Sequence, residues 1–176
     1  DKSKGGLFRG GSLYFGKKKL SINMAEFIHG NQSIHYELAG VREFRLRTPV
    51  LLLHGNGEDM HIFDNMIAPL LGAKGFVLMD SRMQGESFSL DGGGEISYSA
   101  MADDAAALMD ELGINEYDIV GYSDGGIIAL LMAMKSFKVR RFFTIGANTD
   151  PSGLTAKAVR EIKTALRRAN HKGDER

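Results

Sequence analysis

Short apolar runs alternate along this chain with longer segments in which apolar residues recur at helical spacing. Six segments have the pattern of strands: residues 25–30, 33–39, 50–53, 76–80, 117–120 and 141–146. The clearest is Val50 to Leu53, because an unbroken apolar run behind Pro49 is typical of a strand buried on both faces. Asn31-Gln32 between the first two segments predicts a hairpin.

Helical spacing appears in four other segments: residues 60–71, 101–112, 127–134 and 155–169. Gly113 stands where the C-cap of the second of these helices belongs. Strands that alternate with helices form a parallel sheet that is covered on both sides. The pattern therefore predicts the α/β class, with a mainly parallel sheet and helices on both faces.

One domain accounts for most of the chain. Residues 1–23 are rich in Gly and Lys and predict a flexible tail, although the cluster Lys17-Lys18-Lys19 would also suit contact with an anionic surface. Residues 24–154 carry the core pattern, and residues 155–176 hold a helix with a mixed face and a charged tail. No internal repeat and no further boundary is visible.

Composition narrows the functional classes. With 22 Lys+Arg against 22 Asp+Glu the net charge is zero, which argues against a dedicated nucleic-acid binder. No cysteine is present, so disulfides and cysteine nucleophiles are excluded, and the scattered histidines predict no metal site. The longest apolar run is too short to cross a bilayer, and no signal peptide is visible, so we expect a cytoplasmic protein without a membrane span.

The segment from Gly121 to Gly126, GYSDGG, carries the strongest chemical signal. Ser123 lies on a predicted tight turn between a buried strand and a buried helix, with Gly121 and Gly125 two positions to either side. This is the G-x-S-x-G pattern of a nucleophile elbow, in which glycines permit close approach of helix and strand. The turn would place the serine oxygen beside the N–H groups at the helix start, where an oxyanion could be stabilised.

Two further motifs follow the preceding strands. His54-Gly55-Asn56-Gly57 comes directly after the apolar run at 50–53, and DSRMQGES occupies residues 80–87. With the elbow, these motifs resemble the α/β-hydrolase superfamily, in particular its small soluble serine hydrolases, from about residue 24 to 155. That family has an H-G-x-G loop, a D-x-R-G-x-G-x-S-like loop and the elbow in this order. Met83 departs from the pattern, where the family usually has glycine.

The resemblance implies roles for individual residues. Ser123 would be the nucleophile, and the backbone N–H groups of Asn56 and Asp124 would form the oxyanion hole. His54, Gly55 and Gly57 would shape the loop. No cofactor is implied.

Three other side chains near these motifs have expected structural roles. Asp80 and Arg82 are expected to be a framework charge pair that holds the loops at the sheet edge. The Asp124 side chain is expected to point away from the nucleophile, where a carboxylate suits a helix N-terminus.

A general base for Ser123 is not visible in this sequence. In the family the histidine and usually the acid lie after later strands, and we expect this chain to stop after a sixth strand and one helix. By the resemblance, residues 155–176 would be the start of the family's cap helix and a charged tail. His29 and His35 are expected on the far side of the sheet, and His61 at the pocket rim. Asp150 follows the sixth strand, where a minority of these folds place the acid, but an aspartate before proline is also an ordinary turn signal.

Two functions from different classes remain open. The first is a serine hydrolase that acts on a carboxylic ester or related acyl bond of a small molecule, with this chain as a fragment or shortened member. Serine at position 123 argues against haloalkane dehalogenases and epoxide hydrolases, which attack with a carboxylate. The second is a non-catalytic binding protein on the same fold, which the missing base would favour.

An exposed sheet edge is also predicted. A sheet that ends at the sixth strand would leave Phe142, Phe143 and Ile145 near a bare edge. Exposed apolar edges pair with other chains. We therefore expect either a homodimer through this edge or poor solubility.

Overall fold

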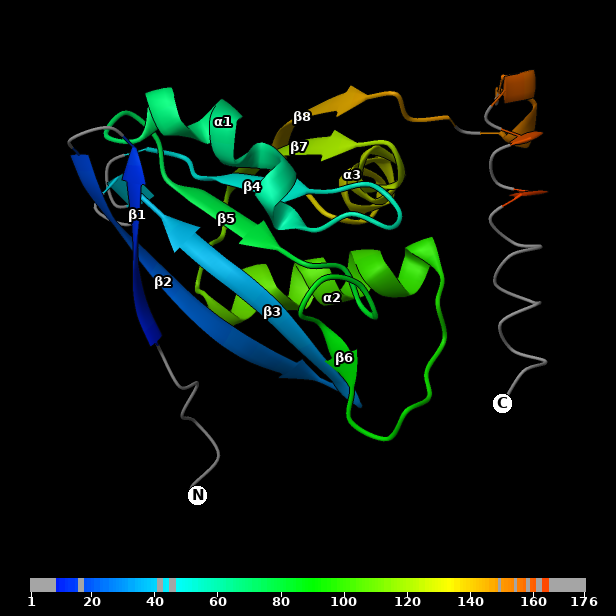
Figure 1. The fold of residues 1–176 in the computed structure, drawn as a ribbon, viewed down its shortest axis with the longest axis horizontal. Coiled ribbons are helices and arrows are strands. Elements are labelled where there is room, and N and C mark those ends of the chain that lie inside the picture. Colours follow the sequence, from blue (N-terminus) through cyan, green and yellow to red (C-terminus); the bar gives the residue numbers. More distant parts are fainter. Residues whose placement is uncertain are drawn as a thin grey trace.

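The computed structural model describes residues 9–15, 18–40, 43–44, 47–148, 150–153, 155–157, 159–160 and 163–164. Within these ranges the chain forms one mixed sheet with helices on both of its faces (Figure 1). The predicted fold class is therefore confirmed.

The sheet has the strand order β1-β2-β3-β5-β4-β7-β8, and β6 pairs with β3 beside this path. The strands are β1 (Arg9–Phe15), β2 (Lys18–His29), β3 (Gln32–Ala39), β4 (Val50–Leu53), β5 (Phe76–Met79), β6 (Phe88–Ser89), β7 (Tyr117–Tyr122) and β8 (Val139–Ile145). Strands β5, β4, β7 and β8 are mutually parallel, whereas β1, β2, β3 and β6 pair antiparallel. The parallel half carries the candidate site.

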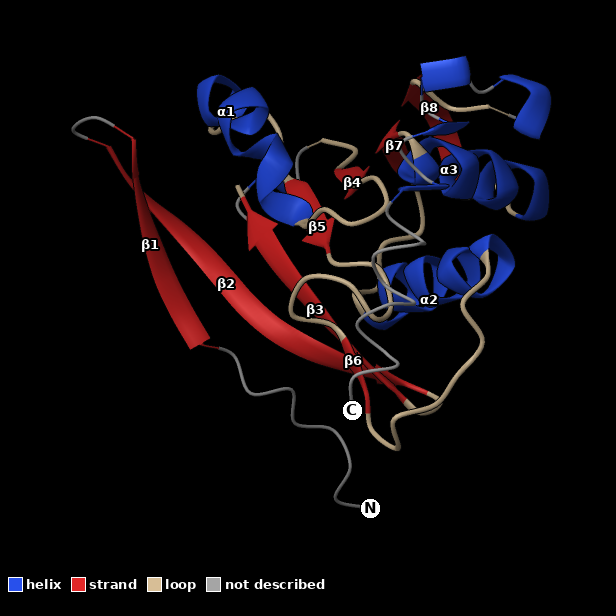
Figure 2. Ribbon diagram, turned by 45° about the vertical axis from the view of Figure 1, so that its right-hand side comes forward, coloured by secondary structure: helices blue, strands red, loops and turns tan. Residues whose placement is uncertain are grey.

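Alternate side chains of the central strands enter two separate cores. Leu51 and Leu53 of β4 face a core built with α2 (Tyr98–Glu111) and α3 (Asp124–Lys135). Val50 and Leu52 face a second core, formed with the short helices η2 (Met60–Phe63) and α1 (Asp64–Ile67) on the other side (Figure 2). Burial on both faces explains why β4 reads as a continuous apolar run.

The helices largely follow the sequence pattern. The segment predicted at 60–71 is helical as η2, α1 and η3 (Ala68–Leu70), with Pro69 in the last of these. Ser97 caps α2 by accepting the N–H of Ala100 at 3.2 Å. Gly113 follows α2 with a φ of 68°, as expected of a C-cap glycine.

The N-terminal region differs from the prediction of a flexible tail over residues 1–23. Residues 9–15 form β1, and residues 18–23 belong to β2, which pairs with β3 along the register from Ile22↔Ala39 to His29↔Gln32. The physical reason is visible in the alternation of Leu20, Ile22 and Met24 with polar residues, a strand pattern that the lysine cluster obscured.

The C-terminal prediction is tested only in part. Residues 156–157, 159–160 and 163–164 are helical, in agreement with the helix predicted at 155–169. The remainder of that helix and the charged tail lie outside the described residues. Pro151–Gly153 forms a 3-10 turn (η4) between β8 and this segment.

Candidate active site

Ser123 lies between β7 and α3 in a backbone conformation that amino acids other than glycine rarely adopt. Its φ is 52° and its ψ is −116°. Its N–H donates to the carbonyl of Ile145 in β8 at 2.7 Å, which fixes the turn to the neighbouring strand. The predicted strand-turn-helix context of the serine is therefore present.

The two glycines around Ser123 are required by close packing. A Cβ on Gly121 would collide with the backbone carbonyl of Gly125. A Cβ on Gly125 would collide with the backbone carbonyl of Leu53 in β4. Backbone atoms cannot move aside as a flexible side chain can, so the turn needs glycine at both positions.

The loop after β4 lies directly beside the serine. A Cβ built on Gly55 would be 3.1 Å from the Cβ of Ser123 and 2.7 Å from Oε2 of Glu58. The serine and the Glu58 carboxylate therefore lie against the same glycine. The structure thus brings the H-G-x-G motif and the elbow together, as the resemblance implies.

His54 shapes this loop from inside the protein. The residue is 1% exposed. Nε2 accepts the N–H of Ser81 at 2.9 Å, so the ring proton is on Nδ1, which donates to the carbonyl of Gly55 at 2.7 Å. The imidazole links the loops after β4 and β5, and both of its nitrogens are occupied by these bonds.

Asp80 fixes the backbone around the loop that follows β5. Its two carboxylate oxygens accept the N–H groups of Met60 and Glu86, each at 2.8 Å. Its own carbonyl accepts the Ser87 hydroxyl at 2.9 Å. The framework role expected for Asp80 agrees with these contacts.

Arg82 does not pair with Asp80, and this corrects the expected charge pair. Its guanidinium forms a bidentate ion pair with Asp104 of α2, at 2.6 and 2.7 Å. Asp104 is fully buried and also contacts Nδ1 of His29 at 2.7 Å. Arg82 donates further to the carbonyls of Glu95 and Ala100. Sequence reasoning missed Asp104 because it lies on a helix far along the chain.

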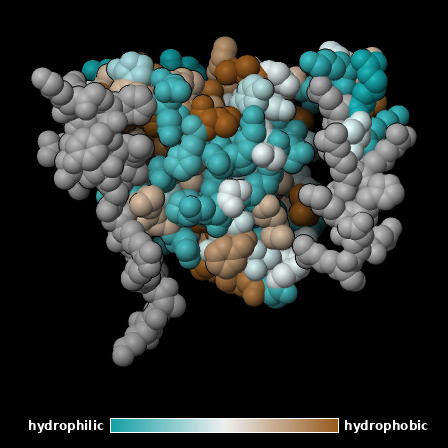
Figure 3. Space-filling view, viewed as in Figure 1, coloured by the Kyte–Doolittle hydropathy of each residue, from teal (hydrophilic) through white to brown (hydrophobic). Residues whose placement is uncertain are grey.

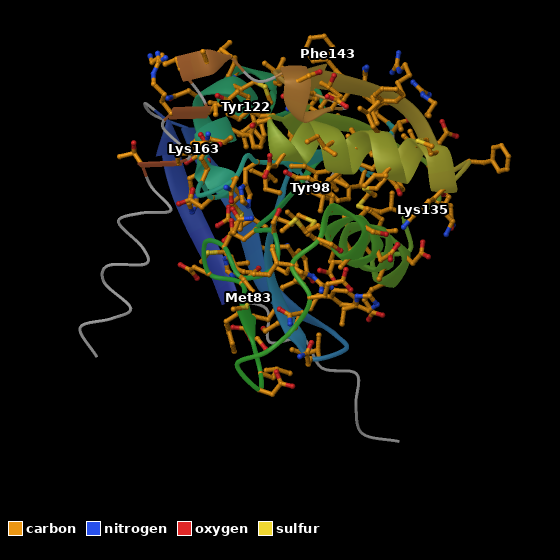
Figure 4. All side chains as sticks on the ribbon, turned by 90° about the vertical axis from the view of Figure 1, so that its right-hand side faces the viewer. Met83, Tyr98, Tyr122, Lys135, Phe143 and Lys163 are labelled. Carbon is orange, nitrogen blue, oxygen red and sulfur yellow. The ribbon has the colours of Figure 1, made fainter. Side chains whose placement is uncertain are left out.

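Asp124 is the first residue of α3, and Tyr98 is the first residue of α2. Partial burial, and then the negative charge of Asp124, raises the pKa of Tyr98. Tyr98, Tyr122 and Met83 all lie at the carboxyl edge of the sheet, seen face-on in Figure 4. The negative charge of Asp124 therefore lies near the start of α2, and the expectation that this side chain points away from the nucleophile stays a prediction.

No described histidine forms a hydrogen bond with Ser123. The His61 side chain is half exposed and lies 3.4 Å from a carboxylate oxygen of Asp64. Burial alone would lower the pKa of His61, but Asp64 and Glu37 outweigh it and raise the pKa, which holds the imidazole toward its protonated form. His29 pairs with Asp104, and the backbone N–H of His35 donates to the Ser87 hydroxyl. His171 lies outside the described residues.

Asp150 is committed to a turn. Its carboxylate accepts the N–H of Ser152 at 2.7 Å, and its carbonyl accepts that of Gly153 at 3.0 Å. The Ser152 bonds lower the pKa of this exposed carboxyl. These contacts fit the turn signal that the sequence offered as the alternative to a catalytic acid.

Two polar side chains that bind the loop after β4 were not singled out from the sequence. Glu58 accepts the N–H of Gly55 at 3.1 Å, and Gln84 accepts the N–H of Gly57 at 2.7 Å. The spacing from Gly55 to Glu58 is that of a capping-box glutamate reaching back three residues, a signal available in the sequence. Gln84 comes from a different loop, and no local pattern predicts its contact.

The described residues also bear on metal sites and membrane spans. The described residues contain no group of three or more histidine or acidic side chains that could hold a metal ion. None of the described helices has the length and apolar character needed to span a membrane.

Several solved structures resemble this chain. A Pseudomonas aeruginosa protein described provisionally as an epoxide hydrolase is 24% identical, with a TM-score of 0.62 over 70% of this chain and 40% of its own. Est816, described as an N-acyl homoserine lactone degrading enzyme, is 22% identical, with a TM-score of 0.64 over 78% and 51%. Cfl2 from Burkholderia cenocepacia is 19% identical, with a TM-score of 0.66 over 77% and 45%. The chain spans 40% to 51% of the length of these proteins.

A family model decides the relationship. Likeness to structures at these identities shows the fold alone. The model described as alpha/beta hydrolase fold matches residues 48–168, which is more than half of the chain and includes all three motifs around Ser123. The chain therefore belongs to the α/β-hydrolase fold family.

Proposed function

We propose that this chain carries the nucleophile and the oxyanion hole of a serine hydrolase that acts on a carboxylic ester or a related acyl bond. The observation that carries the proposal is the strained conformation of Ser123 directly beside the loop at Gly55. Strain of this kind persists only where the surrounding structure imposes it, and such residues cluster at active sites.

The proposed chemistry is acyl transfer. The Ser123 hydroxyl oxygen would attack the carbonyl carbon of the substrate, and the carbonyl oxygen would become negatively charged. The N–H groups of Asn56 and Asp124 would donate to that oxyanion. Neither N–H donates to another described residue, so both are free for this role. One such donor contributes about 3 kcal/mol to the transition state.

Serine favours an ester over an epoxide as the substrate class. One of the similar structures is described provisionally as an epoxide hydrolase, but the nucleophile position of this chain holds Ser123 and not a carboxylate. Est816 is described as degrading a lactone, which is a cyclic carboxylic ester. That bond is of the class we propose for this chain.

A binding protein without catalytic activity is the second candidate. It is favoured by one observation, the absence of any described histidine or carboxylate within hydrogen-bonding distance of the Ser123 hydroxyl. A serine hydroxyl is a weak nucleophile unless a base takes its proton.

A fluorophosphonate probe separates these two candidates. The purified chain and its Ser123→Ala variant are treated with the probe, checked for folding by circular dichroism, and examined by intact-mass spectrometry. The proposed function requires one adduct on the wild-type chain and none on the variant. A folded wild-type chain that takes up no probe would favour the binding protein and overturn the proposal for this chain.

A further inference from the structure

Three consecutive backbone N–H groups in the loop after β4 differ in their hydrogen-bond acceptors. The N–H of Gly55 donates to Oε2 of Glu58 at 3.1 Å, and the N–H of Gly57 donates to Oε1 of Gln84 at 2.7 Å. The N–H of Asn56, between them, donates to no described residue. Two side-chain acceptors therefore take the outer donors and leave the middle one open.

The carbonyl of Gly55 fixes the direction of this open N–H. It accepts Nδ1–H of His54 at 2.7 Å and the N–H of Glu58 at 3.3 Å. In a trans peptide the C=O and the following N–H point in opposite directions. Holding the carbonyl against His54 and Glu58 thus turns the Asn56 N–H away from both.

We propose that Glu58 and Gln84 are positioning residues that hold the Asn56 N–H in the orientation of an oxyanion donor. This inference rests on the proposed function, because an oxyanion forms only if Ser123 attacks a carbonyl. Glu58 acts from within the loop and lies against the same glycine as Ser123. Gln84 acts from the loop after β5, so the donor is held from two sides.

The backbone beside Gln84 supports this role. Met83 has a φ of 60°, a conformation that costs a residue other than glycine about 1–2 kcal/mol. Asp80 holds the same loop by accepting the N–H of Glu86, and Ser81 binds His54. The loop after β5 is thus rigidly tied on both sides of Gln84, which gives its side chain a defined place against Gly57.

Variants that keep or remove the acceptor oxygen test the proposal. Glu58→Gln and Gln84→Glu retain an oxygen for the Gly55 and Gly57 N–H groups, whereas Glu58→Ala and Gln84→Ala do not. Glu86→Ala is the matched control. It removes a carboxylate from the loop after β5 that also holds Gln84, and the Glu86 side chain is 78% exposed. Circular dichroism verifies that each variant is folded.

The first measurement is the rate of reaction of Ser123 with a fluorophosphonate, separated into a maximal rate and a half-saturating probe concentration. Both alanine variants should lose roughly 100- to 1,000-fold in the maximal rate, the range seen for a lost oxyanion donor. The half-saturating concentration should stay close to that of the wild type, and the acceptor-keeping variants and the control should react nearly normally. Alanine variants that react at the wild-type rate would overturn the proposal.

The second measurement does not depend on catalysis. Amide hydrogen exchange followed by NMR reports whether the N–H groups of Gly55 and Gly57 are protected in the wild type and lose protection in Glu58→Ala and Gln84→Ala, respectively. Unchanged protection would overturn the positioning role even if Ser123 reacts. If the wild-type chain takes up no probe but shows this pattern of protection, the proposed function fails, whereas the binding of the loop after β4 by Glu58 and Gln84 is supported.

Discussion

Strain at single residues is concentrated at the candidate site. Within the described ranges, Ser123 and Met83 are the residues other than glycine with a positive φ, at 52° and 60°. Both lie in loops at the carboxyl edge of the sheet, one after β7 and one after β5. Such conformations cost about 1–3 kcal/mol each, and the surrounding packing must outweigh that cost.

Replacing Ser123 by glycine should release this strain. We expect Ser123→Gly to be more stable than Ser123→Ala by about 1 kcal/mol, because glycine adopts the observed φ and ψ freely and alanine does not. The gain is smaller than the full strain, since glycine also gains freedom in the unfolded chain. Urea denaturation of the two variants measures the difference. Equal midpoints would show that the elbow is not strained in solution.

Gly125 offers the opposite test, in which a side chain is added. Its Cβ would meet the carbonyl of Leu53, so we expect Gly125→Ala to lower the free energy of unfolding by about 3 kcal/mol, the upper end for overpacked sites. Gly93→Ala is the control, because its Cβ would have only Asp91 nearby, at 3.5 Å. The comparison is made by urea denaturation. Similar losses in both variants would contradict the close approach of β4 and α3.

Between elements, one buried ion pair joins the loop after β5 to α2. Asp104 is fully buried, and its carboxylate forms an ion pair with Arg82 and contacts the His29 ring. Breaking a buried pair leaves an uncompensated charge, which typically costs 3–5 kcal/mol. We expect a loss of about this size in the free energy of unfolding for Arg82→Met.

A neighbouring pair on the same helix serves as the control. Asp103 pairs with Lys135 of α3 at 2.8 Å, but both side chains are about half exposed. Lys135→Met should therefore cost less than about 1 kcal/mol. The double variant Arg82→Met/Asp104→Leu should recover much of the loss of Arg82→Met, because it removes the stranded carboxylate as well. A double variant no more stable than the single one would argue against this explanation.

Elements were predictable from sequence where the cause of their structure is local. Every residue of β4 is buried, so its apolar run was visible, and the glycines around Ser123 marked the elbow. By contrast, β6 consists of two residues that pair with Gln32 and Ser33. No local sequence pattern predicts this pairing. The contact of Gln84 with Gly57 depends in the same way on two loops meeting in space.

At the scale of the whole molecule, apolar side chains are exposed at several places, including the region of β6 and the strand β8. Phe88 in β6 and Leu90 directly after it are 47% and 55% exposed, and Figure 3 shows apolar residues at the lower end of the face in view. Strand β8 ends the described sheet and pairs only with β7 there. On this strand Phe142, Phe143 and Ile145 are 47%, 63% and 41% exposed.

The β8 edge predicts self-association of the isolated chain. Phe142 and Phe143 are consecutive, so they point to opposite faces of the sheet, and each side chain is about half exposed. An unpaired strand with apolar side chains on both faces favours pairing with another chain.

We expect size-exclusion chromatography with light scattering to give a dimer or larger species. Phe143→Lys should shift the population toward monomer, because a charge on an edge strand opposes pairing. Phe88→Lys, which places the same charge at the other apolar patch, should leave the association unchanged. A monodisperse wild-type monomer would show that this edge does not mediate association.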